Sequence, residues 1–258
     1  MRLKSALRRG VAAAVIAGVV VSSGIPAYAG TWDIANGDIT VKGASDESGN
    51  YNKVKQGDKD FEKDEGETVI TGESDKNTVT IDTSGGKVDV TFDDLKIDAS
   101  DKGKAAVRVE GGHDATIELD GDNKLKSGSH NAGLEKNGNE SSGKLTIKDD
   151  NDTKGSLTAK GGEGGGAGIG GGIKSTGSSI TIRGGTIKAV GGSNAAGIGD
   201  GAGRATGPTD DPNPGDLYIC GDAEVTAKAG SQMTDAKAPA IGGKYGEVPT
   251  DALSDDRS

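Results

Sequence analysis

Acidic residues gather in three turns, each following one of three successive β-type runs. They are Asp93, Asp94, Asp120, Asp122, Asp149, Asp150 and Asp152. If the runs stack in register, these turns lie along one edge, and carboxylates a few ångströms apart repel unless they are protonated or bridged. Ca²⁺ accepts about six to eight such oxygens. The pattern therefore predicts a calcium column that could also bridge an acidic sugar.

A second interpretation of the same turns needs no metal. Asp and Asn are common turn residues because their side chains hydrogen-bond to the local backbone, and here they would point to water. Neither the EF-hand spacing nor the nonapeptide calcium-binding repeat is present. This interpretation is favoured, and calcium remains the only cofactor that the sequence suggests.

The chain lacks the usual parts of a hydrolytic site. His113 and His130 are its only histidines and Cys220 its only cysteine, so a zinc site, a Ser-His-Asp triad and an internal disulfide are not predicted. Polysaccharide hydrolases need clustered carboxylates, and lyases need calcium with a basic arginine. Arg108 and Arg183 fall on different strand sets with no Asp pair beside them. Both are expected to be solvated, and the protein is not predicted to be an enzyme.

The N-terminus is typical of a secretory signal. Arg2, Lys4, Arg8 and Arg9 precede an apolar stretch, and Ala27-Tyr28-Ala29 supplies small residues for cleavage between Ala29 and Gly30. The stretch is shorter than the roughly 20 residues that span a bilayer. We expect a secreted or extracellular protein with no membrane span after signal removal. No sortase-type anchor is visible, but association with the cell surface stays open.

Charge excludes nucleic acid as a main partner. The chain has 30 Lys and Arg against 40 Asp and Glu, a net charge of −10. Loss of the four basic signal residues leaves 26 against 40, or −14. Nucleic-acid binding depends on clustered cations that neutralise phosphates. The negative field of this chain would instead repel a polyanion such as DNA.

Internal repeats give the fold. Short strands such as Ser179-Ile-Thr-Ile-Arg are followed by a second strand, a Gly-rich connection and a third strand such as Ala196-Gly-Ile-Gly. The last apolar residues of the first strands are Phe92, Leu119, Ile147, Ile182 and Ile219. Their uneven separation, 27 to 37 residues, is explained by loop insertions. The repeats predict an all-β, single-stranded, right-handed parallel β-helix of about five or more coils of three short strands.

Alternation within the strands predicts the core. Ile180 and Ile182 face inward while Thr181 and Arg183 face solvent, and Ile169, Ile198 and Ile241 are expected to form a ladder on the third side. Glycines beside that ladder permit a tight corner or close approach of another backbone. The charged segment 46–67 is predicted to be a long solvated loop.

These features divide the chain into four parts. We predict a signal peptide over 1–29, an N-terminal cap with the first coils over 30–87, the repeat β-helix over 88–245, and a polar C-terminal tail over 246–258.

The motifs Ala167-Gly-Ile-Gly-Gly-Gly and Ser179-Ile-Thr-Ile-Arg-Gly-Gly-Thr, together with Thr31-Trp-Asp-Ile-Ala-Asn-Gly-Asp-Ile-Thr-Val, resemble a group of exported Gram-positive, clostridial-type β-helix repeat proteins. The likeness covers most of the mature chain. Such proteins are commonly labelled carbohydrate-binding domain-containing or adhesin-like surface proteins, and one branch is associated with acidic plant polysaccharide and calcium. The resemblance implies a secreted binding module for polysaccharide or a cell-surface glycan.

Three functions remain open. The first is non-catalytic polysaccharide binding, by hydrogen bonds or calcium, because the few aromatic residues are too scattered to form a stacking platform. The second is a polysaccharide lyase or hydrolase on the same fold. The third is a purely structural surface protein. The sequence does not indicate an oligomeric state.

Overall fold

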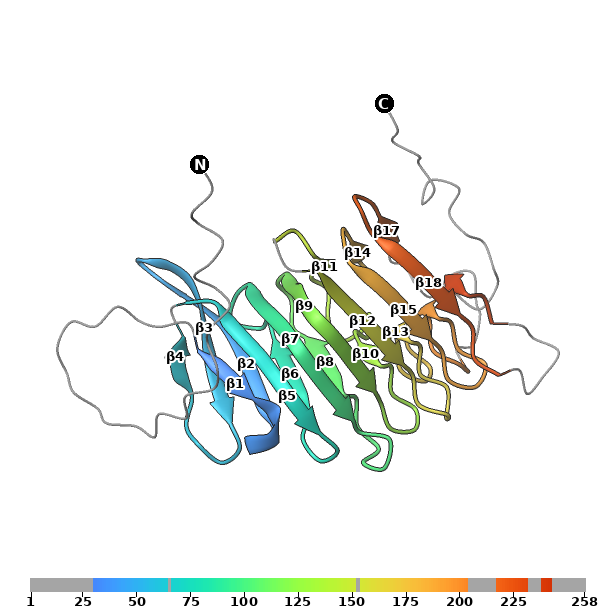
Figure 1. Cartoon of the computed structure of the whole chain (residues 1–258), viewed down its shortest axis with the longest axis horizontal. Coiled ribbons are helices and arrows are strands. Elements are labelled where there is room, and N and C mark those ends of the chain that lie inside the picture. Colours follow the sequence, from blue (N-terminus) through green and yellow to red (C-terminus); the bar gives the residue numbers. More distant parts are fainter. Residues whose placement is uncertain (1–29, 65, 152–153, 204–216, 232–237, 243–258) are drawn as a thin grey trace.

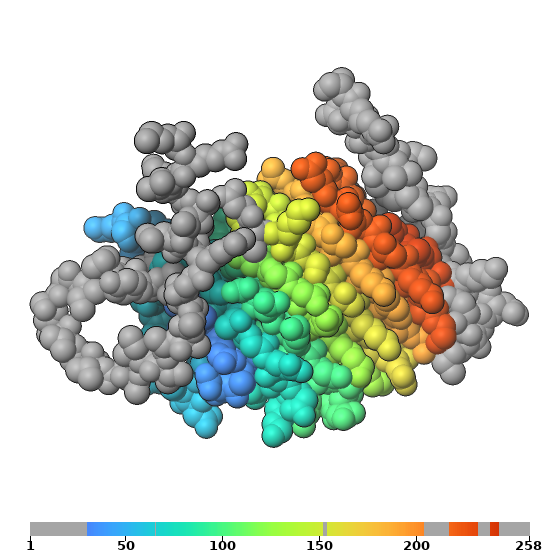
Figure 2. Space-filling view, in the orientation of Figure 1, coloured from blue at the N-terminus to red at the C-terminus, as the bar shows by residue number. Residues whose placement is uncertain are grey.

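The chain coils into a parallel β-helix with two long sheets. The computed structural model describes residues 30–64, 66–151, 154–203, 217–231 and 238–242. Within these ranges, successive coils lie side by side from one end of the molecule to the other (Figure 1), and they appear as successive diagonal bands of colour in the space-filling view (Figure 2). The parallel β-helix predicted from the repeats is confirmed.

Sheet A contains ten described strands. Its main path is β1 (Thr31–Asp33), β5 (Thr68–Ser74), β7 (Val88–Asp98), β9 (Ala115–Lys126), β11 (Leu145–Lys148), β14 (Ile180–Ile182) and β17 (Leu217–Ile219). Three further strands, β12 (Gly155–Lys160), β15 (Thr186–Val190) and β18 (Glu224–Lys228), continue it beside the second half of β9.

Sheet B contains nine described strands. Seven are parallel: β2 (Ile39–Asp46), β6 (Val79–Asp82), β8 (Val107–Glu110), β10 (Leu134–Glu135), β13 (Ile169–Gly170), β16 (Ile198–Gly199) and β19 (Ile241–Gly242). Two more, β3 (Gly49–Gln56) and β4 (Glu62–Asp64), are antiparallel and extend the sheet beyond β2. A 3-10 helix over Ile34–Asn36 joins β1 to the rest of the first coil.

The three-strand coil predicted from the repeat occurs only in the last three described coils. In β7 and β9 the first and second predicted strands are joined into one strand, which bends at a register shift after Asp93. A chain can cross such a bend without leaving the sheet because an extra residue on one strand increases its local twist. Each of these strands therefore has a first half before the bend and a second half after it.

Stacking of the coils corrects one ladder proposed from the sequence. Ile147 pairs with Ile117 and not with Leu119, while Ile182 and Ile219 follow Ile147 as expected. The error arose because β9 continues through its bend without leaving the sheet. Leu119, the last apolar residue of its first half, therefore lies two positions beyond Ile117, the residue that pairs with Ile147. Leu119 instead pairs with Phe92.

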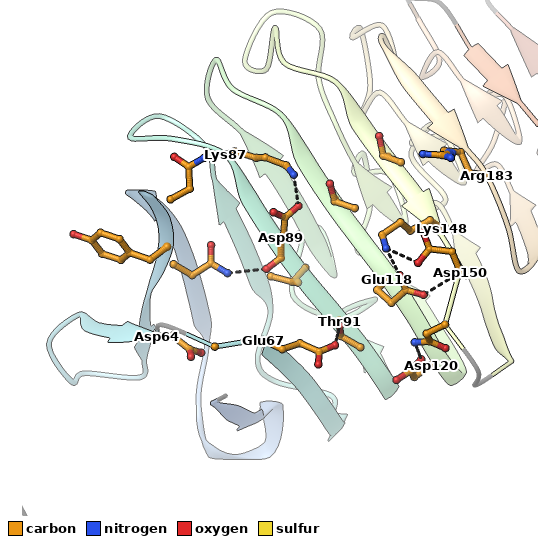
Figure 3. A pocket seen from close by; sticks show the side chains of 18 residues that line it. Asp64, Glu67, Lys87, Asp89, Thr91, Glu118, Asp120, Lys148, Asp150 and Arg183 are labelled. Atoms are coloured by element: carbon orange, nitrogen blue, oxygen red, sulfur yellow. Dashed lines mark hydrogen bonds and ion pairs between the residues drawn. The ribbon is translucent and has the colours of Figure 1, made fainter. Parts of the chain in front are cut away.

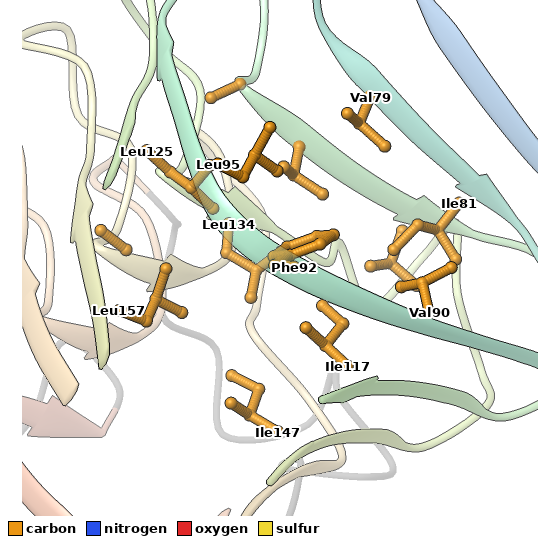
Figure 4. Close-up of a cluster of buried hydrophobic side chains, with 14 of the residues drawn as sticks. Val79, Ile81, Val90, Phe92, Leu95, Ile117, Leu125, Leu134, Ile147 and Leu157 are labelled. Atoms are coloured by element: carbon orange, nitrogen blue, oxygen red, sulfur yellow. The ribbon is translucent and has the colours of Figure 1, made fainter. Parts of the chain in front are cut away.

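The interior is a stack of mainly aliphatic side chains with few aromatic rings. Phe92 is the largest fully buried side chain, and it lies among Leu95, Ile117 and Leu134 (Figure 4). The predicted ladder on sheet B is confirmed, since Ile169 pairs with Ile198 and Ile198 with Ile241. Removing such side chains from water, at about 25 cal/mol per Å² of apolar area, is the main stabilising contribution.

The N-terminal end is covered by a hairpin. Residues 46–67 were expected to be a long solvated loop, but β3 and β4 lie within them and pair antiparallel with one another. The prediction failed because charged residues alternate with half-buried and buried ones along β3, where Asn52 and Val54 face inward. The antiparallel addition covers the edge of β2 that would otherwise offer unpaired backbone groups.

Glycines permit close stacking at one corner. Gly128, Gly162, Gly192 and Gly230 occupy this corner in successive coils. A Cβ atom on any of the last three would overlap the carbonyl oxygen of the glycine one coil earlier. The same holds for Gly168 and Gly170 beside the isoleucine ladder, where the next coil approaches closely. The close backbone approach inferred from the Gly-rich motifs is therefore present.

The predicted signal peptide and C-terminal tail lie outside the described residues, as does Ala29 at the predicted cleavage site. Gly30 is described, and its backbone N–H donates to Asp64 Oδ1 at 3.1 Å. Within the described ranges no helix is long and apolar enough to span a membrane.

Gly192→Ala tests the stacked corner. The added methyl group must push two coils apart, so we expect a loss of about 1–3 kcal/mol in the free energy of unfolding, as for other overpacked sites. Denaturant unfolding measures this loss. Gly112→Ala is the matched control because its Cβ would meet only Ser142 Oγ at 3.6 Å. Equal stability of the two variants would contradict close stacking at this corner.

Candidate functional site

A polar groove crosses the outer face of sheet A. It has a volume of about 760 Å³ (Figure 3). Its lining comes from β3, β4, β7, β9 and β11, from the residues just before β5 and β7, and from those that follow β11 and β14. The groove runs across the strands, so neighbouring coils each contribute side chains at the same height. It uses only the first halves of β7 and β9.

Two rows of outward side chains form its floor. The strand registers place Asp89, Thr116 and Thr146 in one row. Thr91 and Glu118 lie two residues further along their strands, and Lys148 completes the second row. These positions face outward because successive side chains of a strand point to opposite faces.

An ion cluster occupies the middle of the groove. Lys148 Nζ lies 2.6 Å from Glu118 Oε2 and 2.6 Å from Asp150 Oδ1. The backbone N–H of Asp150 donates to Glu118 Oε1 at 3.0 Å, which draws the turn after β11 onto β9. The Glu118 side chain is 10% exposed and that of Asp150 is 61% exposed.

The two carboxyl groups have pKa values shifted in opposite directions. Burial raises the pKa of Glu118, against the lowering effect of the hydrogen bond from Lys148. The hydrogen bond from Lys148 lowers the pKa of Asp150. Carboxyl pairs whose environments separate their pKa values are suited to acid and base roles.

Arg183 lies at the C-terminal end of the groove. It directly follows β14, is exposed, and forms no ion pair with the described residues. Its positive charge is close enough to lower the pKa of Asp150. The sequence indicated no Asp pair beside Arg183, but one aspartate and one glutamate, Asp150 and Glu118, reach this groove from two other coils.

The N-terminal end of the groove is formed by the hairpin. Asn52 Nδ2 donates to Thr68 Oγ1 at 2.8 Å, and Thr91 Oγ1 donates to Glu67 Oε1 at 2.6 Å. Tyr51 is the one aromatic residue of the lining, and Lys63 Nζ lies 4.2 Å from its ring centroid. The ammonium covers part of this ring, so hydrogen-bonding groups dominate the surface offered to a ligand.

The acidic turns lie on the bend of sheet A and do not form the predicted column. Asp93 pairs with Asp120, but Asp122 pairs with Ser156 rather than with a third carboxylate. The expected stacking failed because the acidic residues of the first two turns lie within the continuous strands β7 and β9. The third group begins at Asp149, after β11 has ended and the chain has left the sheet.

Most of the predicted calcium ligands have protein partners. Asp94 Oδ1 accepts from the backbone N–H of Asp122, Asp149 Oδ2 accepts from that of Gly155, and Asp120 Oδ1 accepts from the Asn151 amide. Asp122 and Asp150 pair with Lys124 and Lys148.

Over the described ranges, no group of three or more acidic, His or Cys residues is placed to hold a metal ion. Asp152 lies outside those ranges. Calcium binding at the bend stays a prediction.

The remaining residues singled out from the sequence lie apart from the groove. Arg108 is on sheet B, where Nη2 lies 2.8 Å from Glu135 Oε1, so the two arginines do not share a face, as expected. His113 Nδ1 lies 2.8 Å from the carbonyl oxygen of Thr83. Cys220 is a free, exposed thiol after β17.

Glu118 and Lys148 were missed by the sequence analysis. Their only signal was an outward position in the runs Thr116-Ile-Glu and Thr146-Ile-Lys. That signal is present in every strand of the repeat, so it could not single them out without the register.

Comparison of the chain with protein-family models, with curated proteins and with solved structures finds no match. The resemblance to exported β-helix repeat proteins therefore stays a prediction.

Asp93→Asn tests the repulsion at the bend. Partial burial and the neighbouring carboxylates of Asp120 and Asp94 raise the pKa of Asp93. Its ionisation therefore costs folded-state stability as pH rises through the raised pKa. We expect the variant to gain about 0.3 kcal/mol near neutral pH, a small value because the site is solvated. The gain should vanish below the unfolded-state pKa, where Asp93 is protonated in both states.

Thermal unfolding across pH measures this dependence. Asp101→Asn, in an exposed turn, is the control and should show no such gain. A gain that persists in acid would contradict the electrostatic cause.

Proposed function

We propose that this is an exported protein that binds polysaccharide non-covalently in the groove of sheet A. The observation that carries the proposal is an open groove that spans several coils and is lined almost wholly by hydrogen-bonding side chains. A long polymer can cross several coils there, and each coil adds contacts at the same height. Export is part of the proposal and rests on the N-terminal signal pattern.

The chemistry of the lining suits sugar hydroxyl groups. Threonine hydroxyls and the Asn50 amide can donate and accept, the carboxylates accept, and Arg183 donates. Acidic side chains outnumber basic ones in this lining, six to three. A ligand rich in hydroxyl groups can use such a mixed surface without a charge of its own.

Removing two hydroxyls from the floor tests this function. In Thr116→Val/Thr146→Val the shape of both side chains is kept and two hydrogen-bonding groups are lost. At about 0.5–1.5 kcal/mol per hydrogen bond, we expect the affinity for a bound glycan to fall about tenfold. A glycan array with and without EDTA identifies the glycan, and isothermal titration measures the affinity.

Thr158→Val/Thr226→Val is the matched control. These threonines also point outward from sheet A, on β12 and β18, but do not line the groove. Their loss should change the affinity less than about twofold. Failure of the native protein to bind any polysaccharide, neutral or acidic, would reject the proposal and favour a structural surface protein.

Polysaccharide cleavage is a second candidate function, favoured by one observation. Glu118, Asp150, Lys148 and Arg183 meet in one groove, and the two carboxyl groups have pKa values shifted apart. In a cleaving enzyme Glu118 would be the group that transfers a proton at the scissile bond, because burial raises the pKa of its carboxyl.

Glu118→Gln separates cleavage from binding. It keeps the shape of the side chain but cannot transfer a proton, so cleavage should fall at least about 100-fold. New reducing ends measure hydrolysis, and binding is measured on the same variant. No cleavage by the native protein of any polysaccharide that it binds would reject the catalytic function and leave the binding function intact.

A further inference from the structure

Lysines concentrate on the other half of the outer face of sheet A. Past the bend, the strand registers place Lys96, Lys124, Thr158, Lys188 and Thr226 in one row. They place Asp98, Lys126, Lys160, Val190 and Lys228 in the next row. We call the six lysines of these two rows the lysine strip. It is notable in a chain whose net charge is −10.

The strip is neutralised at one end and not at the other. Lys124 Nζ lies 2.6 Å from Asp122 Oδ2, and Lys126 Nζ lies 3.0 Å from Asp98 Oδ2. Lys160, Lys188 and Lys228 are exposed and form no ion pair with any residue that the structure describes. Three lysines without an ion pair to a described residue therefore lie on β12, β15 and β18, and Glu224 is the one acidic residue among the outward positions of these three strands.

The three free lysines follow a zigzag across successive strands. They lie on β12, β15 and β18, and Lys188 is displaced by one row from the other two. With strands about 4.8 Å apart and about 6.7 Å between alternate residues, successive Cα atoms are about 8 Å apart. A polymer lying along the axis of the β-helix would meet one ammonium group per coil.

We propose that the lysine strip binds a linear phosphodiester polymer whose phosphates are separated by short neutral spacers, of the poly(glycerol phosphate) kind. Ammonium groups act as point charges toward phosphate and do not need a fixed ligand plane. Between the free lysines lie only Val190 and the hydroxyls of Thr158 and Thr226, which offer little to a sugar ring. This surface and its ligand differ from those of the groove.

Nucleic acid fits this surface less well. The outward residues of β12, β15 and β18 include no aromatic side chain on which bases could stack.

A triple variant of the full chain tests the proposal, with synthetic poly(glycerol phosphate) as the probe. Surface plasmon resonance at low ionic strength should show binding by the native protein that weakens as salt is added. Lys160→Gln/Lys188→Gln/Lys228→Gln should lower the affinity about tenfold, from three contacts of up to about 1 kcal/mol each. The corresponding Arg triple keeps the charges and should retain the affinity.

Two controls separate this site from general charge and from the groove. Lys59→Gln/Lys76→Gln/Lys102→Gln removes the same charge from exposed positions outside the strands, and should lower the affinity less than about twofold. Thr116→Val/Thr146→Val should leave it unchanged.

The proposal is overturned if the native protein does not bind the probe, or if both Gln triples lose affinity equally. It is also overturned if oligothymidylate binds as tightly as poly(glycerol phosphate). Should the Gln triple not fold, the comparison of the native protein, the Arg triple and Lys228→Gln decides the same question.

Discussion

In-register stacking of parallel coils is the constraint on which the rest of the structure depends. Each coil hydrogen-bonds to the coils before and after it, so every residue of a strand has fixed neighbours at the same height. Aliphatic ladders follow on the inside, because a register that buries one isoleucine buries its counterparts. Outside, the same register turns isolated side chains into rows that cross the molecule.

The bend in sheet A divides its outer face into two surfaces of different chemistry. Before it lies the groove, with threonines, amides and an ion cluster around Lys148. Beyond it lies the lysine strip. The acidic residues of the bend stand between them, and they largely accept hydrogen bonds that close the bend and the following turn. Two surfaces that differ in charge therefore lie on one sheet.

Local residue patterns specify the fold of this chain more completely than they specify its groove. Gly-rich corners and alternating Ile-Thr-Ile runs predicted the parallel β-helix and the Ile169–Ile198–Ile241 ladder, because local patterning and coil stacking impose the same inward positions. The hairpin over part of 46–67 was missed because charge there was taken to mean solvent exposure. The acidic column failed for a different reason, since strand continuity through the bend changed which residues face one another.

The sequence by itself determined the repeat, the parallel β architecture, the inward side chains and the acidic charge, because each depends on residue types and short-range periodicity. Only the tertiary structure decided which outward residues meet. Glu118 and Asp150 are 32 positions apart, and they share Lys148 only because β11 pairs in register with the first half of β9. Contacts between coils depend on loop lengths and register shifts, which residue patterns within one coil do not specify.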